Sequence, residues 1–356
     1  MATLKSLVDE TTNIKNELKT CHANLKNNLV GKGVEVSSGD KLATLVDKVK
    51  NLKNEKHYFV DTFVDYSSHA PVNLIVGADS ERLYFMGGAL TNTNGYYYAT
   101  NSNICYNTIN NTWETKANLP TARYSTSSAT VGGSIYVIGG IAGSNMSSSV
   151  TTNECYNPKS NTWTTKTGAS TKGYFSTVVV DNKIYCFFKG AYSQICYDTV
   201  SDTWTSKASI PTSNIHHGLC SAGNNIHAIG GNKDAGANSM VLAEHNVYDT
   251  VSNTWTTNKS NNPYARYTFS AIHYDNKIYC FGGVGYQASG DRRNTNRVDC
   301  YNVETGTWER LTNLPDAICS ENFKLVGETI YCTGGTAYNT TSFKYEQFKK
   351  IYKFIL

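Results

Sequence analysis

Two short motifs recur in register along most of the chain and restrict what it can fold into. The first is a Gly-Gly doublet after a short apolar stretch, and the second is a tyrosine seven residues before a tryptophan. The doublets are Gly87-Gly88, Gly139-Gly140, Gly230-Gly231, Gly282-Gly283 and Gly334-Gly335, with Lys189-Gly190 in the place of a further copy. The aromatic pairs are Tyr106/Trp113, Tyr156/Trp163, Tyr197/Trp204, Tyr248/Trp255 and Tyr301/Trp308, and Tyr345/Tyr352 has the same spacing. Together the motifs predict six copies of one unit.

Each copy is expected to contain four antiparallel strands, a to d. Stretches such as 134–138 and 277–281 are short, apolar and rich in β-formers, which predicts strands buried on both faces. A glycine pair at the end of strand b lets the backbone turn with positive φ or pass close to a neighbour. The tryptophan begins strand d, where its large ring fills the widening space between units.

A period near 50 residues with a strand ending in Gly-Gly resembles the kelch repeat, in which each copy forms one blade of a β-propeller. The resemblance covers roughly residues 70 to 356. We therefore expect a mainly β protein with a six-bladed kelch-like propeller over 71–356. A helical module precedes it over 1–56, and 57–70 is a linker or a closing strand. For the outer strand of the last blade, the Tyr345/Tyr352 spacing favours 351–355 over 58–63.

Strand alternation places the b–c and d–a connections on one face of the propeller and the a–b and c–d connections on the other. The b–c connections are long and differ from one another, whereas the c–d turns are short and alike. Variable connections on a rigid repeated scaffold usually carry binding. The b–c and d–a face is therefore the expected ligand face.

Aromatic and polar side chains gather in these connections, a combination that suits a sugar, whose ring face stacks while its hydroxyls hydrogen-bond. The candidate ligand-binding residues are Tyr96, Tyr97, Tyr98, Arg123, Tyr124, Tyr174, His216, Arg266, Tyr267, Tyr286, Arg292 and Arg293. The alternative is that the two arginines only pin loops and that the tyrosines pack on the propeller.

The N-terminal segment has a different pattern, with apolar residues at alternating steps of three and four. The seam includes Leu4, Leu7, Ile14, Leu18 and Leu25, which predicts a coiled coil, and leucine at a with isoleucine at d favours three or more chains. The alternative is an amphipathic helix packed on the chain's own second helix, which is expected to begin between residues 38 and 40.

The run from Leu25 to Val49 resembles the N-terminal segment of tail-appendage proteins from phages and phage-like tails of low-GC Gram-positive bacteria. In that family the helical end attaches to the baseplate or trimerises, and the distal domain touches the host envelope. The resemblance implies a homotrimeric receptor-binding protein that adheres to a host glycan or surface protein and contacts tail or baseplate proteins through 1–56. It also implies a virion or tail-like particle assembled in the bacterial cytoplasm and released by lysis. The alternatives are a cytoplasmic protein-interaction module and a sialidase-like, glycan-cleaving enzyme.

Composition argues against several other classes. A formal net charge of +4 is too small for a nucleic-acid surface, no run of 18 apolar residues suggests membrane insertion, and the first residues lack a signal peptide. The adjacent His216 and His217 cannot both ligate copper from one strand, and no Cys/His spacing fits a zinc site, so we expect no metal, cofactor or catalytic residue. Most cysteines repeat with the blades as core residues, although Cys186 with Cys196 and Cys280 with Cys300 are left open as pairs.

Overall fold

The computed structural model describes most of the propeller and short parts of the N-terminal segment. The described ranges are 58–62, 75–91, 97–143, 148–173, 175–188, 192–212, 216–233, 240–257, 259–286, 292–333, 335–339, 344–347 and 351–356, with single residues and short stretches between 19 and 44. The chain divides into two compact units, Met1–His57 and Tyr58–Leu356.

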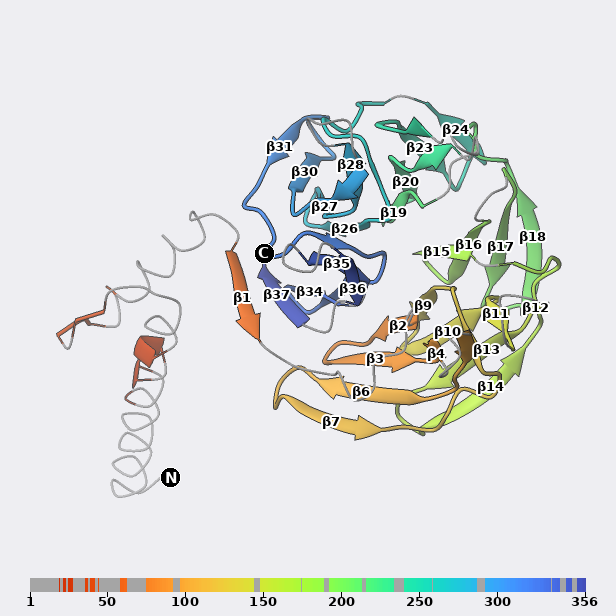
Figure 1. Ribbon diagram of the computed structural model, residues 1–356, viewed down its shortest axis with the longest axis horizontal. Coiled ribbons are helices and arrows are strands. Elements are labelled where there is room, and N and C mark those ends of the chain that lie inside the picture. Colours follow the sequence, from red (N-terminus) through yellow and green to blue (C-terminus); the bar gives the residue numbers. More distant parts are fainter. Residues whose placement is uncertain are drawn as a thin grey trace, which may run out of the picture. The chain divides into compact units, whose positions relative to one another are not determined.

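The described residues of Tyr58–Leu356 form six four-stranded antiparallel sheets around a common centre (Figure 1). Blade 1 is β2 (Ile75–Ala78), β3 (Arg82–Met86), β6 (Asn103–Asn107) and β7 (Thr112–Thr115); blade 2 is β9 (Ser128–Val131), β10 (Ser134–Ile138), β13 (Asn153–Asn157) and β14 (Thr162–Lys166). Blade 3 is β15 (Phe175–Val180), β16 (Lys183–Phe188), β17 (Gln194–Asp198) and β18 (Thr203–Lys207); blade 4 is β19 (Gly218–Ala222), β20 (Asn225–Ile229), β23 (His245–Asp249) and β24 (Thr254–Thr256). Blade 5 is β26 (Ser270–Tyr274), β27 (Lys277–Phe281), β30 (Val298–Asn302) and β31 (Trp308–Arg310); blade 6 is β33 (Lys324–Val326), β34 (Thr329–Cys332), β37 (Ile351–Ile355) and β1 (Tyr58–Thr62).

Blade 6 closes the ring with strands from both ends of the unit. Its order is β33-β34-β37-β1, and β1 pairs with β37 from Tyr58↔Ile355 to Thr62↔Ile351. The outermost strand therefore comes from before the first blade, and the prediction that 351–355 fills that place was wrong. Phe354 pairs with Ile330 as Tyr301 pairs with Ile278, so Phe354 holds the strand-c tyrosine position. Tyr345 instead lies in an additional hairpin of the long b–c connection.

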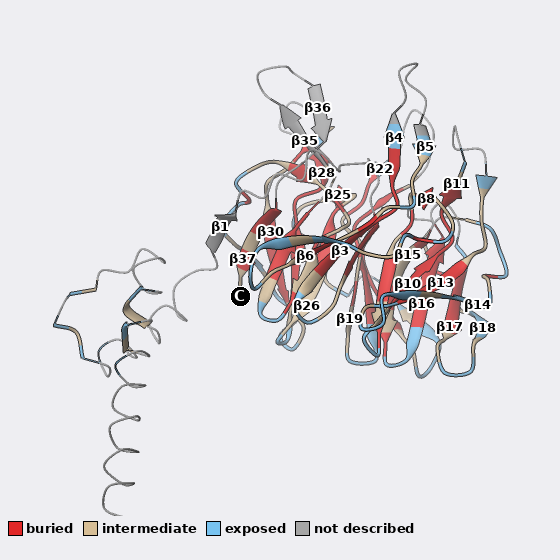
Figure 2. Cartoon of the chain, turned by 90° about the horizontal axis from the view of Figure 1, so that it is seen from below, coloured by how far each residue is buried: buried red, intermediate tan, exposed pale blue. Residues whose placement is uncertain are grey.

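The core consists of apolar clusters between neighbouring blades, and buried residues lie mainly in the inner three strands, whereas outer strands such as β14 and β18 are intermediate or exposed (Figure 2). The strand-c tyrosines lie inside these clusters, as Tyr156 with 0% exposure shows, while Trp163 packs against that ring at 5.0 Å and stays partly exposed. The tryptophans thus cover the outer edges of the tyrosines.

In blades 2 to 5 a hydrogen bond from the tryptophan joins the blade to the one before it. In blade 2 the Trp163 Nε1–H donates to Ala117 O of blade 1 at 2.8 Å, and the Ala117 N–H donates to Asn161 Oδ1 at 2.8 Å. The same Oδ1 accepts the Tyr156 hydroxyl at 2.8 Å. Asn161 has a positive φ of 55°, a conformation that asparagine tolerates better than most residues. One turn residue therefore satisfies a buried hydroxyl and a neighbouring backbone amide.

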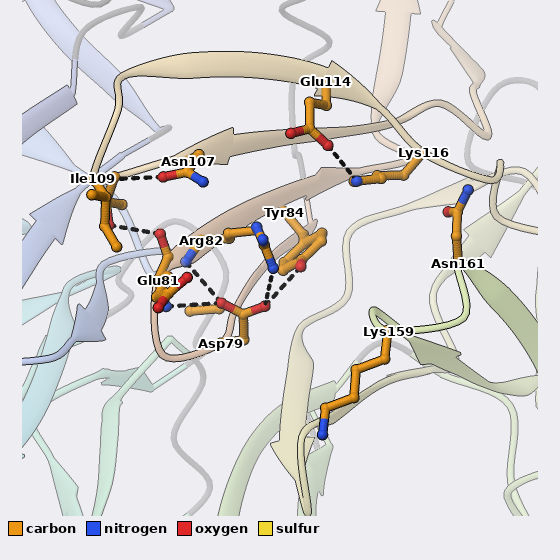
Figure 3. A network of polar contacts seen from close by, with 12 residues as sticks. Asp79, Glu81, Arg82, Tyr84, Asn107, Ile109, Glu114, Lys116, Lys159 and Asn161 are labelled. Atoms are coloured by element: carbon orange, nitrogen blue, oxygen red, sulfur yellow. Dashed lines mark hydrogen bonds and ion pairs between the residues drawn. The ribbon is translucent and has the colours of Figure 1, made fainter.

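In blade 1, side-chain oxygens also hold the a–b turn and the c–d turn (Figure 3). In blade 1, Asn107 Oδ1 accepts the Ile109 N–H at 2.9 Å in the c–d turn. Asp79 Oδ1 accepts the Arg82 N–H at 2.8 Å, and Asp79 Oδ2 accepts the Tyr84 hydroxyl at 2.7 Å. These contacts fix the path of the backbone in both turns.

The Gly-Gly doublets have the role that the sequence predicted for them. Gly139 has a φ of +66°, and a Cβ there would lie 2.4 Å from Gly173 O of the next d–a segment. Any side chain at this position would both strain the backbone and collide with it. Glycine is therefore required where strand b passes under the incoming connection.

Apart from Cys319, the described cysteines are buried thiols that form no disulfide. The strand register excludes the two disulfides that the sequence left open, Cys186 with Cys196 and Cys280 with Cys300. Cys196 pairs with Tyr185 rather than with Cys186, and Cys300 pairs with Tyr279 rather than with Cys280. Adjacent positions on a strand point to opposite faces, so the thiols of each pair lie on opposite sides of the blade.

In the Met1–His57 unit, residues 19, 22–23, 25–27 and 44 are helical. His22 Nε2 lies 2.9 Å from Asp40 O, and Lys26 Nζ donates to Ser37 O at 3.4 Å, so this helical stretch contacts a later part of the same unit. Leu25 is partly buried, whereas Leu4, Leu7, Ile14 and Leu18 lie outside the described residues. The coiled-coil seam and the trimer stay predictions.

Candidate functional site

One face of the propeller carries small sheets that are built from the b–c connections. These are β4 (Ala89–Thr91) with β5 (Tyr97–Ala99); β8 (Arg123–Tyr124) with β11 (Ile141–Ala142) and β12 (Ser148–Ser149); β21 (Asn232–Lys233) with β22 (Met240–Val241); β25 (Arg266–Tyr267) with β28 (Val284–Tyr286) and β29 (Arg292–Asn294); and β32 (Ile318–Cys319) with β35 (Thr336–Asn339) and β36 (Lys344–Gln347). Several stand above the blades on the same side (Figure 2). Because β8, β25 and β32 belong to d–a segments, the prediction that both connections share a face is confirmed. We call this surface the loop face.

Neighbouring connections on the loop face are bonded to one another. The Ala99 N–H of blade 1 donates to Gly143 O of blade 2 at 3.1 Å. The Arg266 N–H, at the entry to blade 5, donates to Leu242 O of blade 4 at 3.2 Å. Backbone contacts of this kind join different sequences into one rim.

Arg123 anchors the blade 2 part of the rim from beneath. Its side chain is 0% exposed, and its Nη2 donates to Val137 O at 3.0 Å and pairs with Glu154 Oε2 at 2.7 Å. Glu154 also accepts the Thr121 hydroxyl at 2.7 Å. Burial lowers the pKa of Arg123 to about 10, which still leaves it charged at neutral pH, and the nearby Glu154 opposes that decrease. The ion pair fixes the d–a segment to strands b and c.

Arg266 anchors the blade 5 part of the rim in the same way. It is 0% exposed, its Nη1 donates to Cys280 O at 3.3 Å and Gly282 O at 3.2 Å, and its other terminal nitrogen pairs with Asp299. The two carboxylate oxygens of Asp299 also share the single Nε–H of Arg297, at 2.9 and 2.8 Å. A buried carboxylate thus holds two guanidinium groups under the rim.

Three d–a segments meet near the inner strands. His216 precedes β19 of blade 4, Tyr267 precedes β26 of blade 5, and Glu321 precedes β33 of blade 6. His216 Nδ1 lies 2.9 Å from Glu321 Oε1, and the side chains are 35% and 22% exposed. The Tyr267 ring is 6.5 Å from the imidazole, and the Thr268 N–H donates to His216 O at 2.7 Å. An imidazole, a carboxylate and a phenol therefore lie close together, each partly exposed to solvent.

Large apolar side chains are also exposed on the loop face. Leu90 and Tyr98 of blade 1 are 37% and 43% exposed, Tyr192 of blade 3 is 54% exposed, and Met240 of blade 4 is 50% exposed. Arg292 is partly exposed and Arg293 is exposed on β29. Exposed apolar groups beside polar ones are typical of an interaction surface.

The structure separates the predicted ligand-binding residues into three groups. Tyr98, His216, Tyr267, Arg292 and Arg293 are at least partly exposed on the loop face. Arg123, Tyr124 and Arg266 are fully buried, which corrects the expectation that they touch a ligand. Their burial follows from the pairing of each arginine with a strand-c acid, so the loop-pinning alternative holds for the two arginines. The backbones of Tyr97 and Tyr286 lie in β5 and β28, while Tyr96 and Tyr174 lie outside the described residues.

Sequence reasoning missed Glu154, Asp299 and Glu321. A signal for the first two was present, because each stands two residues before the strand-c tyrosine in the two blades whose d–a segment contains Arg-Tyr. That coincidence within the repeat predicts an ion pair. No comparable pattern marks Glu321.

Several chemical features bear on catalysis and membranes. Arg123 and Arg266 are occupied by buried carboxylates, so they are not available to converge on a ligand carboxylate as a sialidase site requires. Within the described ranges, no three His, Cys, Asp or Glu side chains are grouped so that they could hold a metal ion. Over the same residues, no helix has the length and apolar character needed to cross a membrane.

Comparison with known proteins identifies the repeats. Residues 192–354 match the KLHDC2/KLHL20/DRC7 Kelch-repeats domain, and residues 122–167 match the Kelch motif. Kelch-like protein 15 of Homo sapiens is 34% identical over 91 residues, and its Mus musculus counterpart is 33% identical over the same length. Each match covers 25% of this chain and 15% of the relative, so only a small part of these curated relatives is spanned. The structure titled "Structure of YjhT" aligns with a TM-score of 0.62 at 14% identity, covering 79% of this chain and 98% of that one, which is a likeness of fold. Both family matches lie within the propeller, so the tail-appendage resemblance stays a prediction.

Proposed function

We propose that this kelch β-propeller is a non-catalytic binding module that holds its ligand against the loop face. The observation that carries the proposal is the rim itself: connections of unlike sequence are bonded together, anchored from below by buried ion pairs, and expose apolar and polar side chains above. A rigid support reduces the ordering cost of binding, and that cost otherwise offsets much of the contact energy.

The exposed side chains suit a ligand with apolar surface and hydrogen-bonding edges. Tyr98 and Tyr192 offer ring faces, and Tyr267 offers a further phenol. His216 and Glu321 offer a donor and acceptors close together. A saccharide fits this combination because its ring face stacks on aromatics while its hydroxyls bond at the edges.

The resemblance of residues 25–49 to tail-appendage proteins supports a specific setting. In this proposal the chain is a receptor-binding protein of a phage or phage-like tail, attached through residues 1–56 and presenting several propellers to the host envelope. Several copies multiply weak individual affinities, because each later contact becomes intramolecular. No covalent step is involved.

A protein-interaction module is the second candidate. Similarity to Kelch-like protein 15 and the exposure of Leu90 and Met240 favour it, since aliphatic and thioether groups suit apolar side chains of a protein more than a sugar ring. Both candidates use the loop face, and they differ in the ligand.

The test compares substitutions on the two faces. Tyr98→Ala combined with His216→Ala is expected to lower binding to host envelopes at least tenfold, with little change in melting temperature. The matched control is Ile109→Ala combined with Val251→Ala, because these side chains are 69% and 76% exposed in c–d turns of the opposite face. Binding that survives the first pair, or that requires only residues 1–56, would place recognition elsewhere. Binding that is lost on protease treatment of the envelopes would favour the protein ligand, and release of free sugar would favour an enzyme.

A further inference from the structure

The junction between blades 4 and 5 contains a buried pair of histidines. His227 of β20 is 2% exposed and His245 of β23 is 0% exposed, and His227 Nδ1 lies 2.8 Å from His245 Nε2. The rings of Tyr301 and Trp308, from blade 5, lie 4.7 and 6.0 Å from the His245 ring. The pair is therefore enclosed by two blades.

The contacts of the pair indicate which nitrogen of each neutral imidazole carries the hydrogen. His245 Nδ1 lies 3.1 Å from Ser260 O, and a carbonyl can only accept, so Nδ1 of His245 carries the hydrogen. His245 Nε2 is then the acceptor, and the His227 Nδ1–H is the donor. The proton between the two rings can sit on either nitrogen, so a further proton has to go to His227 Nε2, a buried atom for which the described structure offers no hydrogen-bond partner.

Among the described groups that shift the pKa of either histidine, none is a carboxylate that would compensate for such a charge. His227 interacts electrostatically with His245, with His273 of β26 and with Lys259, and all three disfavour its protonation. Burial first, then these neighbours, lower the pKa of His227 to about 3. Burial likewise lowers the pKa of His245 to about 4, with Lys259 in the same sense and the Ser260 carbonyl opposing.

Other blades show that the fold does not require histidine here. The position of His227 is held by Tyr84, Tyr136, Tyr185, Tyr279 and Tyr331 in the remaining five. The position of His245 is held by Asn103 in blade 1 and Asn153 in blade 2. Those asparagines donate to the Ala117 and Thr167 carbonyls at 3.1 and 3.2 Å, as His245 does to Ser260. Neutral side chains thus perform the structural task, and among the described strands only those of blade 4 have imidazoles at these two positions.

The residues that directly precede His245 in the sequence belong to the loop face. The three residues before His245 bond to both blades: Leu242 O accepts from the Arg266 N–H at 3.2 Å, Ala243 O from the Asn262 N–H at 2.9 Å, and Glu244 O from the Gly230 N–H at 2.7 Å. Any displacement of β23 from blade 5 must disturb the first two of these bonds, whose donors enter blade 5.

We propose that the His227–His245 pair is an acid-operated release point, at which protonation in mild acid separates blade 4 from blade 5 and loosens the loop face above the junction. The inference concerns the propeller itself and stands whether or not the proposed ligand face is right.

Thiol labelling tests this at residue level. Cys220 and Cys280 lie in the cluster between blades 4 and 5, whereas Cys105 lies between blades 1 and 2 and Cys186 between blades 2 and 3. The full chain is treated at pH 7 and pH 5 with dithiodipyridine, which reacts with thiols in acid, and labelled sites are quantified by mass spectrometry. The labelling of Cys220 and Cys280 is divided by that of Cys105 and Cys186 in the same sample, so the pH dependence of the reagent itself cancels.

Each histidine, if its pKa returns to near 6.5 on opening, favours the open state on the order of 20-fold more at pH 5 than at pH 7. Labelling of Cys220 and Cys280 is therefore expected to rise at least tenfold relative to Cys105 and Cys186. His227→Tyr and, separately, His245→Asn should each reduce the rise while retaining native circular dichroism at pH 7. A uniform rise at all four thiols, no rise, or a rise unchanged in whichever variant folds would overturn the proposal.

Discussion

The inter-blade hydrogen bonds of Asn161 give a quantitative prediction. Replacing Asn161 by glycine keeps a residue that accepts positive φ, as Gly306 does in blade 5 with a φ of 72°, and removes only the amide side chain. The change breaks the bonds from the Tyr156 hydroxyl and the Ala117 amide, both at 2.8 Å. An alanine would add backbone strain and confuse the result.

The expected loss is about 2–3 kcal/mol in the free energy of unfolding. Each hydrogen bond contributes about 1 kcal/mol net, and leaving the buried Tyr156 hydroxyl without its acceptor adds part of the 1–3 kcal/mol cost of an unsatisfied group. Blade 5 offers the reverse experiment, because the Tyr301 hydroxyl is buried and has no hydrogen-bond partner in the described structure. Gly306→Asn should therefore stabilise the protein by about 1 kcal/mol.

Urea denaturation followed by tryptophan fluorescence measures these changes, and Tyr→Phe variants supply the control. Tyr156→Phe should cost about 1 kcal/mol, and it should make Asn161→Gly less harmful because the two residues share one bond. Tyr301→Phe should cost nothing. If Tyr156→Phe and Tyr301→Phe are equally harmful, or if Asn161→Gly is neutral, the turn side chain does not act as described.

Three further predictions follow from closure, ion pairing and titration. Truncation of residues 1–57 should leave the melting temperature of the propeller unchanged, whereas truncation of 1–62 should lower it or cause aggregation, because removing β1 exposes the edge of β37. Arg123→Met should cost about 3–5 kcal/mol in urea denaturation by leaving Glu154 buried without its partner, and Arg123→Met with Glu154→Met should recover most of that loss. In the folded protein the pKa values of His227 and His245 are about 3 and 4, below the unfolded value of about 6.5. The stability that the neutral pair contributes is therefore present above pH 6.5 and is lost as the pH falls toward 4. The pair should account for a loss of about 4 kcal/mol in the free energy of unfolding at pH 5, and the double variant His227→Tyr with His245→Asn should not show this loss.

The sequence predicts the repeated parts of the fold because their physical causes are local. The glycine after each apolar stretch, the tyrosine of strand c and the tryptophan of strand d each occupy one place in a blade, and five copies in register leave little ambiguity. The sharing of one face by the b–c and d–a connections follows from strand alternation alone. Closure fails as a prediction because the pairing of β1 with β37 joins residues at opposite ends of the propeller, and a local spacing such as Tyr345/Tyr352 carries no information about it.

The candidate site was less predictable for a related reason. Whether an arginine in a d–a segment reaches solvent depends on the residue that faces it from strand c, some thirty positions later. Aromatic and charged residues in a connection indicate the face on which they lie, yet their exposure depends on packing between blades. His216 and Tyr98 kept their expected exposure, whereas Tyr124, one residue beyond Arg123, is enclosed by the apolar cluster that contains Ala89 and Ile141.

Closure by β1 also has a consequence in time. The strand is the first part of the propeller to be synthesised, and its partner β37 is the last strand to appear. At 5–20 residues per second the ribosome needs roughly 15 to 60 s to deliver that partner. Throughout this interval β1 lacks its partner strand, so the ring cannot close and the chain carries an unpaired strand edge until its last residues are made.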